Sequence, residues 1–263
     1  TITAGDTTLT GGAGGFANFA VIQGAEQHIT VHGDLSLTGR DSAQSAAGSV
    51  GIARMGNPGG GAASPTNLVL DVDGDVTLTG GNVDGAGAAI GSSSGQNADI
   101  VMTAGGNITL NPGTVAGASA RIGASGDSPA GGDISVAAAG NIALNSNPGL
   151  GTFIRTVDNV TLQADAITQG PNSAIVAGSL STHTDNGAML VGANQLANYH
   201  ATNSTAGSLT LFEQRRLELL MRLVLKPRLI MLDEPVGGLA VTEVTEMIQL
   251  LKELRDRCSI FVI

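Results

Sequence analysis

The sequence is poor in aromatic residues, cysteine and basic side chains. Of its 263 residues none is Trp, one is Tyr and one is Cys, so the core has no large aromatic anchors and no disulfide framework is available. No apolar run reaches the roughly 18 residues of a membrane span. A net charge of −10 argues against nucleic-acid binding, which depends on neutralising phosphates. What is abundant is glycine (39 residues) and hydrophobic side chains (42%), a composition that excludes disorder.

The composition changes sharply near residue 210. Residues 1–210 hold 37 of the 39 glycines, no Lys, four Arg and 14 acidic residues, whereas residues 211–263 hold eight basic and eight acidic residues. All of the net charge therefore belongs to the first part. We predict two domains, residues 1–208 and 209–263. The chain starts at Thr1 without Met or a signal peptide, which is typical of a fragment or a processed product.

The glycine-rich part is a repeat array. Three segments align without gaps, each with an apolar run, a Gly-Asn or Gly-Asp pair and a second apolar run: 68–78, 100–110 and 134–144. Shorter versions occur at 33–37, 158–162 and 178–180. Glycines at 33, 74, 106 and 140 are 41, 32 and 34 residues apart, and a second marker recurs at Ile52, Ile90, Ile122 and Ile154. Repeats of this length are typical of stacked architectures.

Each repeat alternates with a period of two, which indicates short strands with one buried face. Small aliphatic side chains fill a core when coils stack on one another. We therefore predict an all-β, right-handed parallel β-helix (a solenoid) for residues 1–208, with a small α/β tail from about residue 209. The Gly-Asn/Asp pairs should be corners with positive φ. At these corners five side chains should stack as a polar ladder: Asp34, Asp75, Asn107, Asn141 and Asn159.

Three tracts of this region resemble filamentous haemagglutinin repeats: 106–110 (Gly-Asn-Ile-Thr-Leu), 120–123 (Ala-Arg-Ile-Gly) and 192–199. Such repeats belong to large exoproteins of two-partner secretion systems in Gram-negative bacteria. The resemblance implies a structural, adhesive segment that is secreted or displayed on the bacterial cell surface. The implied partners are a host or neighbouring-cell surface, glycans included, and an outer-membrane transporter during export. Loops 54–66 and 123–132 would then be the recognition surfaces.

Residues 211–263 predict the order helix, strand, helix, strand. A first amphipathic helix contains Leu217, Leu220 and Val224 and ends at Pro227. A buried strand covers 229–232 and a second apolar strand covers 259–263. Between them Thr242 should cap a helix. The predicted apolar face of that helix consists of Val244, Met247, Ile248, Leu251 and Leu254.

The segment 229–235 (Leu-Ile-Met-Leu-Asp-Glu-Pro) resembles the Walker B strand of an ABC transporter ATPase, and 209–218 resembles a variant signature segment of the branched-chain amino-acid importer group. The resemblance implies that Glu234 polarises the attacking water and that Asp233 holds Mg²⁺ through water. It also implies that Thr210, Gln214 and Asp233 bind the nucleotide. The alternative function is therefore the ATP-binding subunit of an ABC importer, present only as its carboxy-terminal part and located in the cytoplasm. ATP and Mg²⁺ are cofactors only in that case, and none is expected otherwise.

Several departures argue against ATPase activity. No G-x-x-x-x-G-K-[ST] loop exists anywhere in the sequence, so nothing is provided to cradle the β- and γ-phosphates. Phe212 stands where the signature usually has Gly, Ala240 stands where Asp is frequent, and the sequence ends before the switch histidine. We expect no enzymatic activity. The junction near 208–211 favours an accidental or artefactual chimera of two parents over a functional fusion.

Two other kinds of site receive weaker support. Asp71, Asp73 and Asp75 would suit Ca²⁺, but the EF-hand spacing fails and a solvated outer face is the simpler interpretation. His28 and His32 share a strand face without further ligands, which indicates a surface pair. A carbohydrate-active enzyme would need carboxylates in a groove together with basic and aromatic residues to hold a sugar, and these are scarce here.

Overall fold

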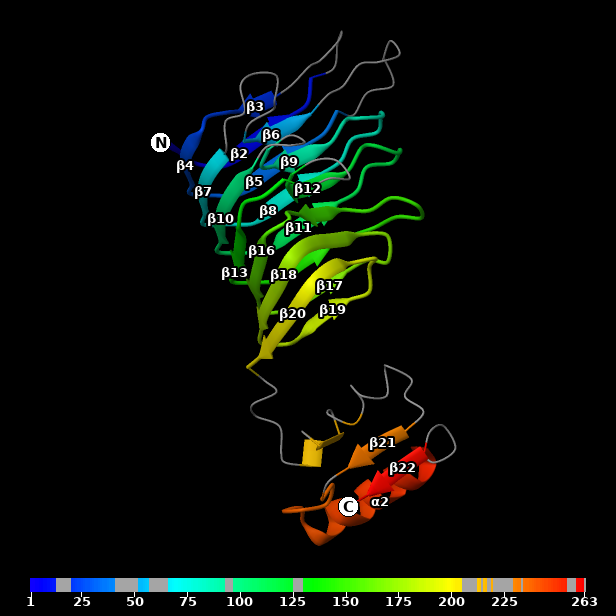
Figure 1. The fold of residues 1–263 in the computed structure, drawn as a ribbon. Coiled ribbons are helices and arrows are strands. Elements are labelled where there is room, and N and C mark those ends of the chain that lie inside the picture. The colour runs from blue at the N-terminus through cyan, green and yellow to red at the C-terminus, as the bar shows by residue number, and fades with distance from the viewer. Residues whose placement is uncertain are drawn as a thin grey trace. The chain divides into compact units, whose positions relative to one another are not determined.

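A computed structural model describes most of the chain, and it divides into two units, Thr1–Asn203 and Ser204–Ile263. The described residues are 1–12, 20–40, 52–56, 66–92, 97–124, 130–204, 212–213, 215–216, 219, 229–232, 234–254 and 259–262. The first unit consists of parallel strands in two large sheets (Figure 1). The second contains a two-stranded sheet and a helix.

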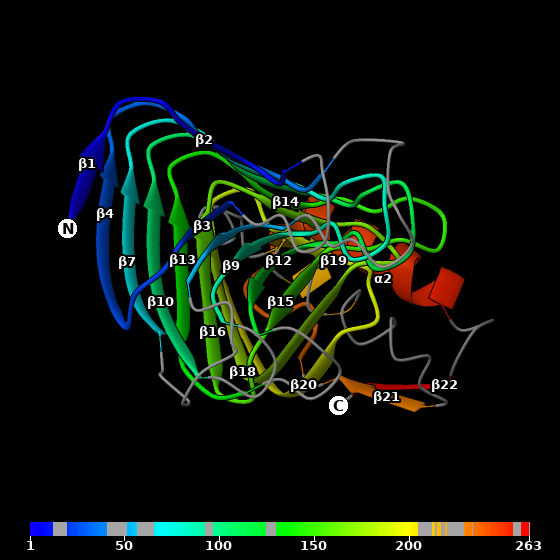
Figure 2. The same ribbon diagram turned by 90° about the horizontal axis from the view of Figure 1, so that it is seen from above.

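The larger sheet has 13 strands in two rows. The first row has six strands: β1 (Ile2–Ala4), β4 (Glu26–Val31), β7 (Thr66–Val72), β10 (Ala98–Ala104), β13 (Ile134–Ala138) and β16 (Asn159–Ala164). The second row has five: β3 (Ala20–Ile22), β6 (Ala53–Met55), β9 (Ala88–Ile90), β12 (Ala120–Gly123) and β15 (Phe153–Arg155). The remaining two are β18 (Ala174–Thr184) and β20 (Gln195–Asn203). Figure 2 shows the first row side by side from β1 to β13.

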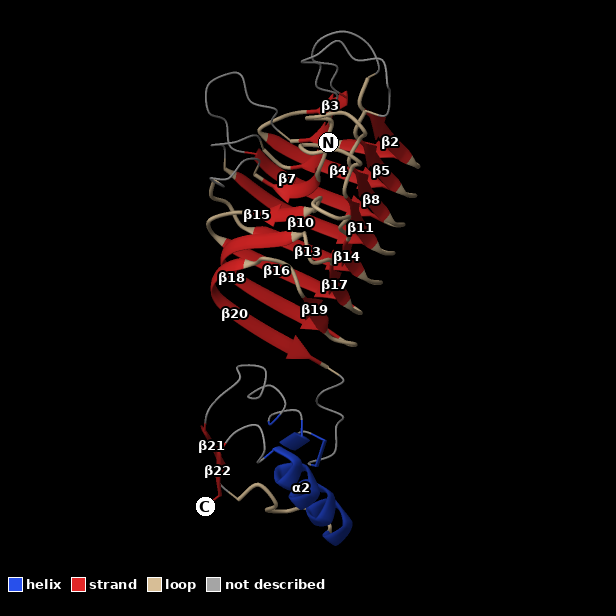
Figure 3. Ribbon diagram, turned by 90° about the vertical axis from the view of Figure 1, so that its right-hand side faces the viewer, coloured by secondary structure: helices blue, strands red, loops and turns tan. Residues whose placement is uncertain are grey.

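The second sheet has seven strands: β2 (Thr7–Thr10), β5 (Leu35–Thr38), β8 (Val76–Thr79), β11 (Ile108–Asn111), β14 (Ile142–Leu144), β17 (Ile167–Gln169) and β19 (Ala188–Leu190). The chain passes through the first row, the seven-stranded sheet and the second row in turn. It then returns to the first row one strand further on, as from β7 through β8 and β9 to β10. Figure 3 shows the resulting stack of strands.

The predicted fold class, a right-handed parallel β-helix, is wrong in view of how the sheets are built. Each face of a regular solenoid is a sheet of its own. Here β18 pairs with β15 along its first residues and with β16 along its later ones, so that the two rows join in a single sheet. The prediction is therefore corrected: the fold consists of two large parallel sheets, of 13 and 7 strands, with few helices. The period-two pattern and the repeat length give no information on this pairing of β18 with both rows.

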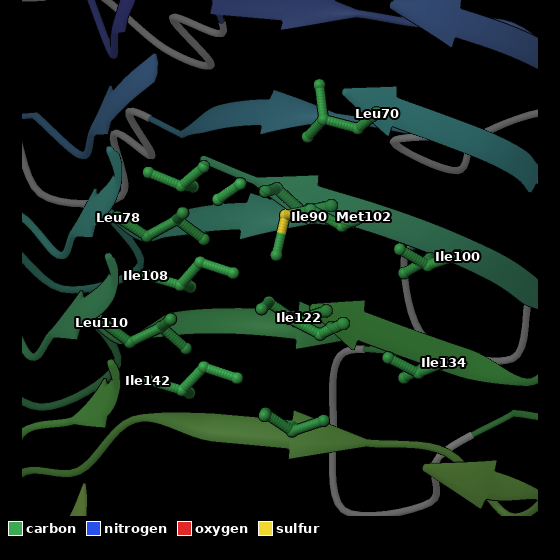
Figure 4. Close-up of a cluster of buried hydrophobic side chains, with 14 of the residues drawn as sticks. Leu70, Leu78, Ile90, Ile100, Met102, Ile108, Leu110, Ile122, Ile134 and Ile142 are labelled. Atoms are coloured by element: carbon green, nitrogen blue, oxygen red, sulfur yellow. The ribbon is translucent and has the colours of Figure 1, made fainter. Parts of the chain in front are cut away.

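The alignment of the repeats is confirmed by the strand register. Ile100 pairs with Leu68 on one side and Ile134 on the other, and Ile108 likewise lies between Val76 and Ile142. One marker was wrong, because Met55 and not Ile52 pairs with Ile90. The inward side chains of both sheets meet in one core, in which Ile90, Ile108 and Ile122 are fully buried (Figure 4). Each such side chain contributes about 1.5–3 kcal/mol on burial.

The predicted polar ladder is present at the corner before the seven-stranded sheet. The backbone N–H of Asp75 donates to Asp34 Oδ1 (2.8 Å), that of Asn107 to Asp75 Oδ1 (2.6 Å), and that of Asn141 to Asn107 Oδ1 (2.9 Å). Asp6, which the repeat search missed, accepts from Asp34 in the same way. Asn159 was wrongly included, since its N–H donates to Asp133 in a second ladder.

The reason for glycine at this corner differs from the prediction. Gly33, Gly74, Gly106 and Gly140 are all described, and none of them has a positive φ. A Cβ on Gly106 would instead overlap Asp75 Oδ1, and a Cβ on Gly74 would overlap Asp34 Oδ1. Glycine is therefore required by the close approach of the ladder side chain from the preceding repeat, and not by a left-handed backbone.

The second unit contains the parallel pair β21 (Leu229–Leu232) and β22 (Ser259–Val262), with α2 (Val241–Leu254) between them in the chain. These elements are confirmed where sequence analysis placed them. The cap at Thr242 was wrong: the helix begins at Val241, and the Ala240 N–H donates to Glu243 Oε2 (2.8 Å). The predicted helix face was correct at Met247 and Leu254, which are buried, and wrong at Ile248, which is exposed.

Replacing Gly106 by Ala should destabilise the first unit by about 1–2 kcal/mol, because displacement of the Asp75 carboxylate leaves the Asn107 N–H without its acceptor. Gly5→Ala is the matched control, since no atom lies within 4 Å of the position that a Cβ would occupy there and the φ of Gly5 is not positive. It should change the free energy of unfolding by less than about 0.5 kcal/mol. Urea unfolding followed by circular dichroism measures both, and equal midpoints for the two variants would refute the close-approach argument.

Candidate functional site

The segment that resembles a Walker B strand ends in a tight turn. Glu234 follows β21 with φ 43°, the one positive φ of a non-glycine residue in the described part of the chain. Its carbonyl accepts from the Gly237 N–H (3.0 Å), and its carboxylate is exposed. The Glu234 carboxylate lies beside Gly237: a Cβ added to Gly237 would lie 3.4 Å from Glu234 Oε2.

The support beneath this turn is one-sided. Ile230 and Leu254 are buried with Leu219 in a small apolar cluster. On the other face of the two-stranded sheet the paired residues Met231 and Phe261 are 56% and 55% exposed. The unit therefore buries one side of the sheet and leaves the other open.

Of the four residues assigned by resemblance to nucleotide chemistry, Glu234 alone lies within the described residues. Thr210, Gln214 and Asp233 lie outside them, as does most of the predicted first helix. The residues present do not fit ATP and Mg²⁺. The sequence has no phosphate-binding loop, and Glu234 stands exposed on its turn. No catalytic step can therefore be derived through a nucleotide.

The carboxylates considered for Ca²⁺ have different partners. Asp71 Oδ2 lies 3.3 Å from His28 Nε2, and Asp71 Oδ1 accepts from Thr103 Oγ1 at 2.8 Å. Asp73 Oδ2 lies 3.0 Å from His32 Nδ1. The two histidines thus form exposed pairs with aspartates of the neighbouring strand region.

Asp75 is separately engaged in the corner ladder, where it accepts from Asn107. Across the ranges that the structure describes, no three His, Cys, Asp or Glu side chains lie close enough to hold a metal ion. The candidate recognition loops 54–66 and 123–132 are largely outside those ranges, since 57–65 and 125–129 are not described.

Sequence analysis missed a group of basic residues on the second row. Arg54, Arg121 and Arg155 stand on β6, β12 and β15, and Arg54 and Arg121 are only 4% and 8% exposed. Burial lowers the pKa of Arg54 to about 10. Burial, followed by repulsion from Arg54 and Arg155, lowers the pKa of Arg121 to about 9. The signal was present in the repeated Ala-Arg-Met-Gly and Ala-Arg-Ile-Gly tracts at 53–56 and 120–123.

None of the described helices has both the length and the apolar character needed to cross a membrane.

A short part of the chain is similar to ATP-binding subunits of ABC transporters. The "High-affinity branched-chain amino acid transport ATP-binding protein BraF" of Pseudomonas aeruginosa is 38% identical over 61 residues, 23% of this chain and 24% of that protein. The corresponding LivG proteins of Salmonella typhimurium and Escherichia coli K12 are 43% identical over 54 residues, 20% of this chain and 21% of theirs. The chain thus spans no more than about a quarter of the curated relatives it matches.

No family model matches the chain, and no solved structure does. The resemblance of residues 1–208 to filamentous haemagglutinin repeats therefore has no support from these comparisons. The similarity to branched-chain amino-acid transport proteins does extend over about as many residues as the predicted domain 209–263.

Addition of millimolar CaCl₂ should leave the unfolding midpoint of the protein unchanged, because Asp71, Asp73 and Asp75 are each engaged with a different partner. MgCl₂ at the same ionic strength controls for screening. A calcium-specific rise in the midpoint that disappears in Asp73→Asn would restore the calcium interpretation.

Proposed function

We propose that residues 209–263 correspond to the carboxy-terminal part of an ATP-binding subunit of the branched-chain amino-acid importer type. The similarity to BraF and LivG supports the proposal most strongly. The order of strand, Glu234 turn, helix and parallel strand is compatible with it. The half-exposed Met231 and Phe261 also support it, since an apolar sheet face of this kind is typical of a segment that packs against more protein. In such a subunit the segment would be cytoplasmic.

In this chain we expect the segment to have no ATPase activity of its own. Phosphoryl transfer depends on positioning the phosphates and stabilising their charge, and the sequence lacks the loop that does both. Glu234 would have no bound phosphate to act on. The segment then contributes structure, and not catalysis.

A second proposal concerns residues 1–203, and it rests on the hydrogen bonds between polar side chains on the surface of that unit. Outward side chains on the first row are linked from strand to strand, as in Asn67 to Glu26 (2.6 Å) and Thr103 to Asp71 (2.8 Å). A surface built this way is acidic and linked by hydrogen bonds between strands, which favours a structural scaffold that presents its exterior to a cell surface or glycan. If this unit is exported, an outer-membrane transporter is its partner during export. A carbohydrate-active enzyme is less supported. Glu26 and Asp99 line one hollow of about 520 Å³, but no Arg, Lys, Trp, Tyr or Phe is among the described residues that line it to hold a sugar.

The purified chain should show no ATP hydrolysis above background, with or without Mg²⁺, and no micromolar ATP binding by calorimetry. Glu234→Gln should be indistinguishable from the parent protein. Glu253→Gln, an exposed acid on α2, is the control for loss of one charge. Turnover that is lost in Glu234→Gln and retained in Glu253→Gln would contradict the absence of catalysis.

The scaffold role predicts that the full chain binds at least one glycan or cell type on an array or in flow cytometry. Glu234→Gln should leave this binding unchanged, since the binding surface belongs to residues 1–203. Absence of binding to every glycan and cell tested would argue against a presenting surface, without affecting the relationship of residues 209–263 to transport proteins.

A further inference from the structure

The outward face of the seven-stranded sheet is built mainly from hydroxyl side chains. Leu35, Leu37 and their counterparts on the other strands belong to the core, so the residues that alternate with them point outward. On β2, β5, β8 and β11 these outward residues form two columns: Thr8, Ser36, Thr77 and Thr109 in the first, and Thr10, Thr38, Thr79 and Asn111 in the second. All but Asn111 are Thr or Ser.

The strand register holds these columns in regular lines. From Thr8 to Thr168 each residue of the first column pairs directly with the next, and no residue is inserted on the way. Neighbouring parallel strands are about 4.8 Å apart, and side chains two positions apart on one strand are about 6.6 Å apart. The hydroxyls therefore form a two-dimensional grid on a sheet whose strands follow one another in Figure 3.

This face has no charge, although the unit as a whole is acidic. The outward positions of the seven strands are all described, and none of them holds an acidic or basic residue. By contrast, the first row of the larger sheet has Glu26, Asp71 and Asp99 at its outward positions. Thr8 is exposed and Thr77 half-buried, so the grid is open to solvent. An uncharged, polar ligand is thus the one that matches this face.

Threonine side chains hold their hydroxyls in nearly fixed places. A β-branched side chain has few accessible χ1 rotamers, so little entropy is lost when its hydroxyl binds a ligand. Each hydroxyl offers one donor and two acceptors, and the methyl group beside it restricts the first shell of water. Within the described part of the chain no side chain is bonded to the hydroxyls of Thr8, Thr77 or Thr109, which leaves them to the solvent.

The grid is similar in its spacing to a tetrahedral lattice of water. Hydrogen-bonded oxygens in such a lattice are about 2.75 Å apart, which places second neighbours about 4.5 Å apart and repeats the layers about every 7.3 Å. These distances agree to within about a tenth with the spacings across and along the strands. A sugar fits less well, because the outward positions of this sheet offer no aromatic ring for it to pack against.

We propose that the outward face of the seven-stranded sheet binds the surface of an ice crystal. The outermost waters of the crystal bond to the hydroxyls of the two columns, and the methyl groups fill the spaces between those waters. Each contact is weak, and binding depends on four adjacent strands that engage the crystal together. The proposal does not rest on either function proposed above, since it uses neither the acidic first row nor residues 209–263.

Thermal hysteresis of the full chain tests the proposal. This quantity is the gap between the melting and freezing points of a solution that contains an ice crystal. We expect a gap that exceeds the one given by an unrelated protein at the same concentration, together with slower coarsening of ice grains during annealing. The absence of both effects from the parent protein would overturn the proposal.

Substitutions then locate the binding face. Thr77→Lys puts a long, charged side chain in the grid and should abolish both effects. Thr8→Lys, at an exposed position where folding is little affected, should weaken them. Thr161→Lys is the matched control, because it makes the same change at a half-buried outward position of β16 in the other sheet, and it should retain both effects.

Two results would contradict the assignment to ice. One is activity of folded Thr77→Lys and Thr8→Lys equal to that of the parent protein, or an equal loss in Thr161→Lys. The other is binding to an insoluble, neutral polysaccharide that Thr77→Lys abolishes while the effects on ice remain, which would assign the face to a sugar. Cell and glycan binding through the acidic first row is measured separately and is unaffected by either result.

Discussion

In-register stacking of identical positions on parallel strands is the constraint on which the first unit depends. Parallel strands about 4.8 Å apart bring each side chain against its counterpart in the next repeat. An isoleucine thus contacts an isoleucine, and an aspartate receives the N–H of the next aspartate or asparagine. The same rule that fills the core with small aliphatic residues also places Arg54 and Arg121 in one column. Stacking is favourable where the repeated groups are apolar or hydrogen-bonded, and unfavourable where they have like charges.

The local structure of this unit could be predicted from the sequence because its signals are short-range and repeated. Period two located the strands, and the spacing of the Gly-Asn/Asp pairs located the partners, so that Ile100 was matched to Leu68 and Ile134 correctly. The role of glycine could not be predicted, since it depends on a side chain from the preceding repeat. The sequence also could not predict that β18 joins the two rows. This depends on which strands the 11-residue β18 pairs with in the folded unit.

The site was less predictable than the fold. Motif resemblance identified Glu234 and its turn, but not whether the exposed carboxylate has anything to act on. The carboxylates 71, 73 and 75 were grouped by proximity in the sequence, whereas the structure gives each its own partner. The arginine column was missed because its members are far apart in the sequence. Searching the repeat alignment for charged residues that recur at one register would have found two of the three.

The double pairing of β18 has a consequence for how such an array is able to grow. Ahead of residue 174 every repeat offers the next one the same three edges, so duplication of one whole repeat in the gene yields a longer stack with unchanged contacts. At β18 two of those edges become one continuous strand, with which β20 pairs along its length, so a copy inserted beyond it meets two edges, β19 and β20, in place of three. Beyond this strand a repeat with three edges cannot be added with unchanged contacts, whereas on its amino-terminal side it can.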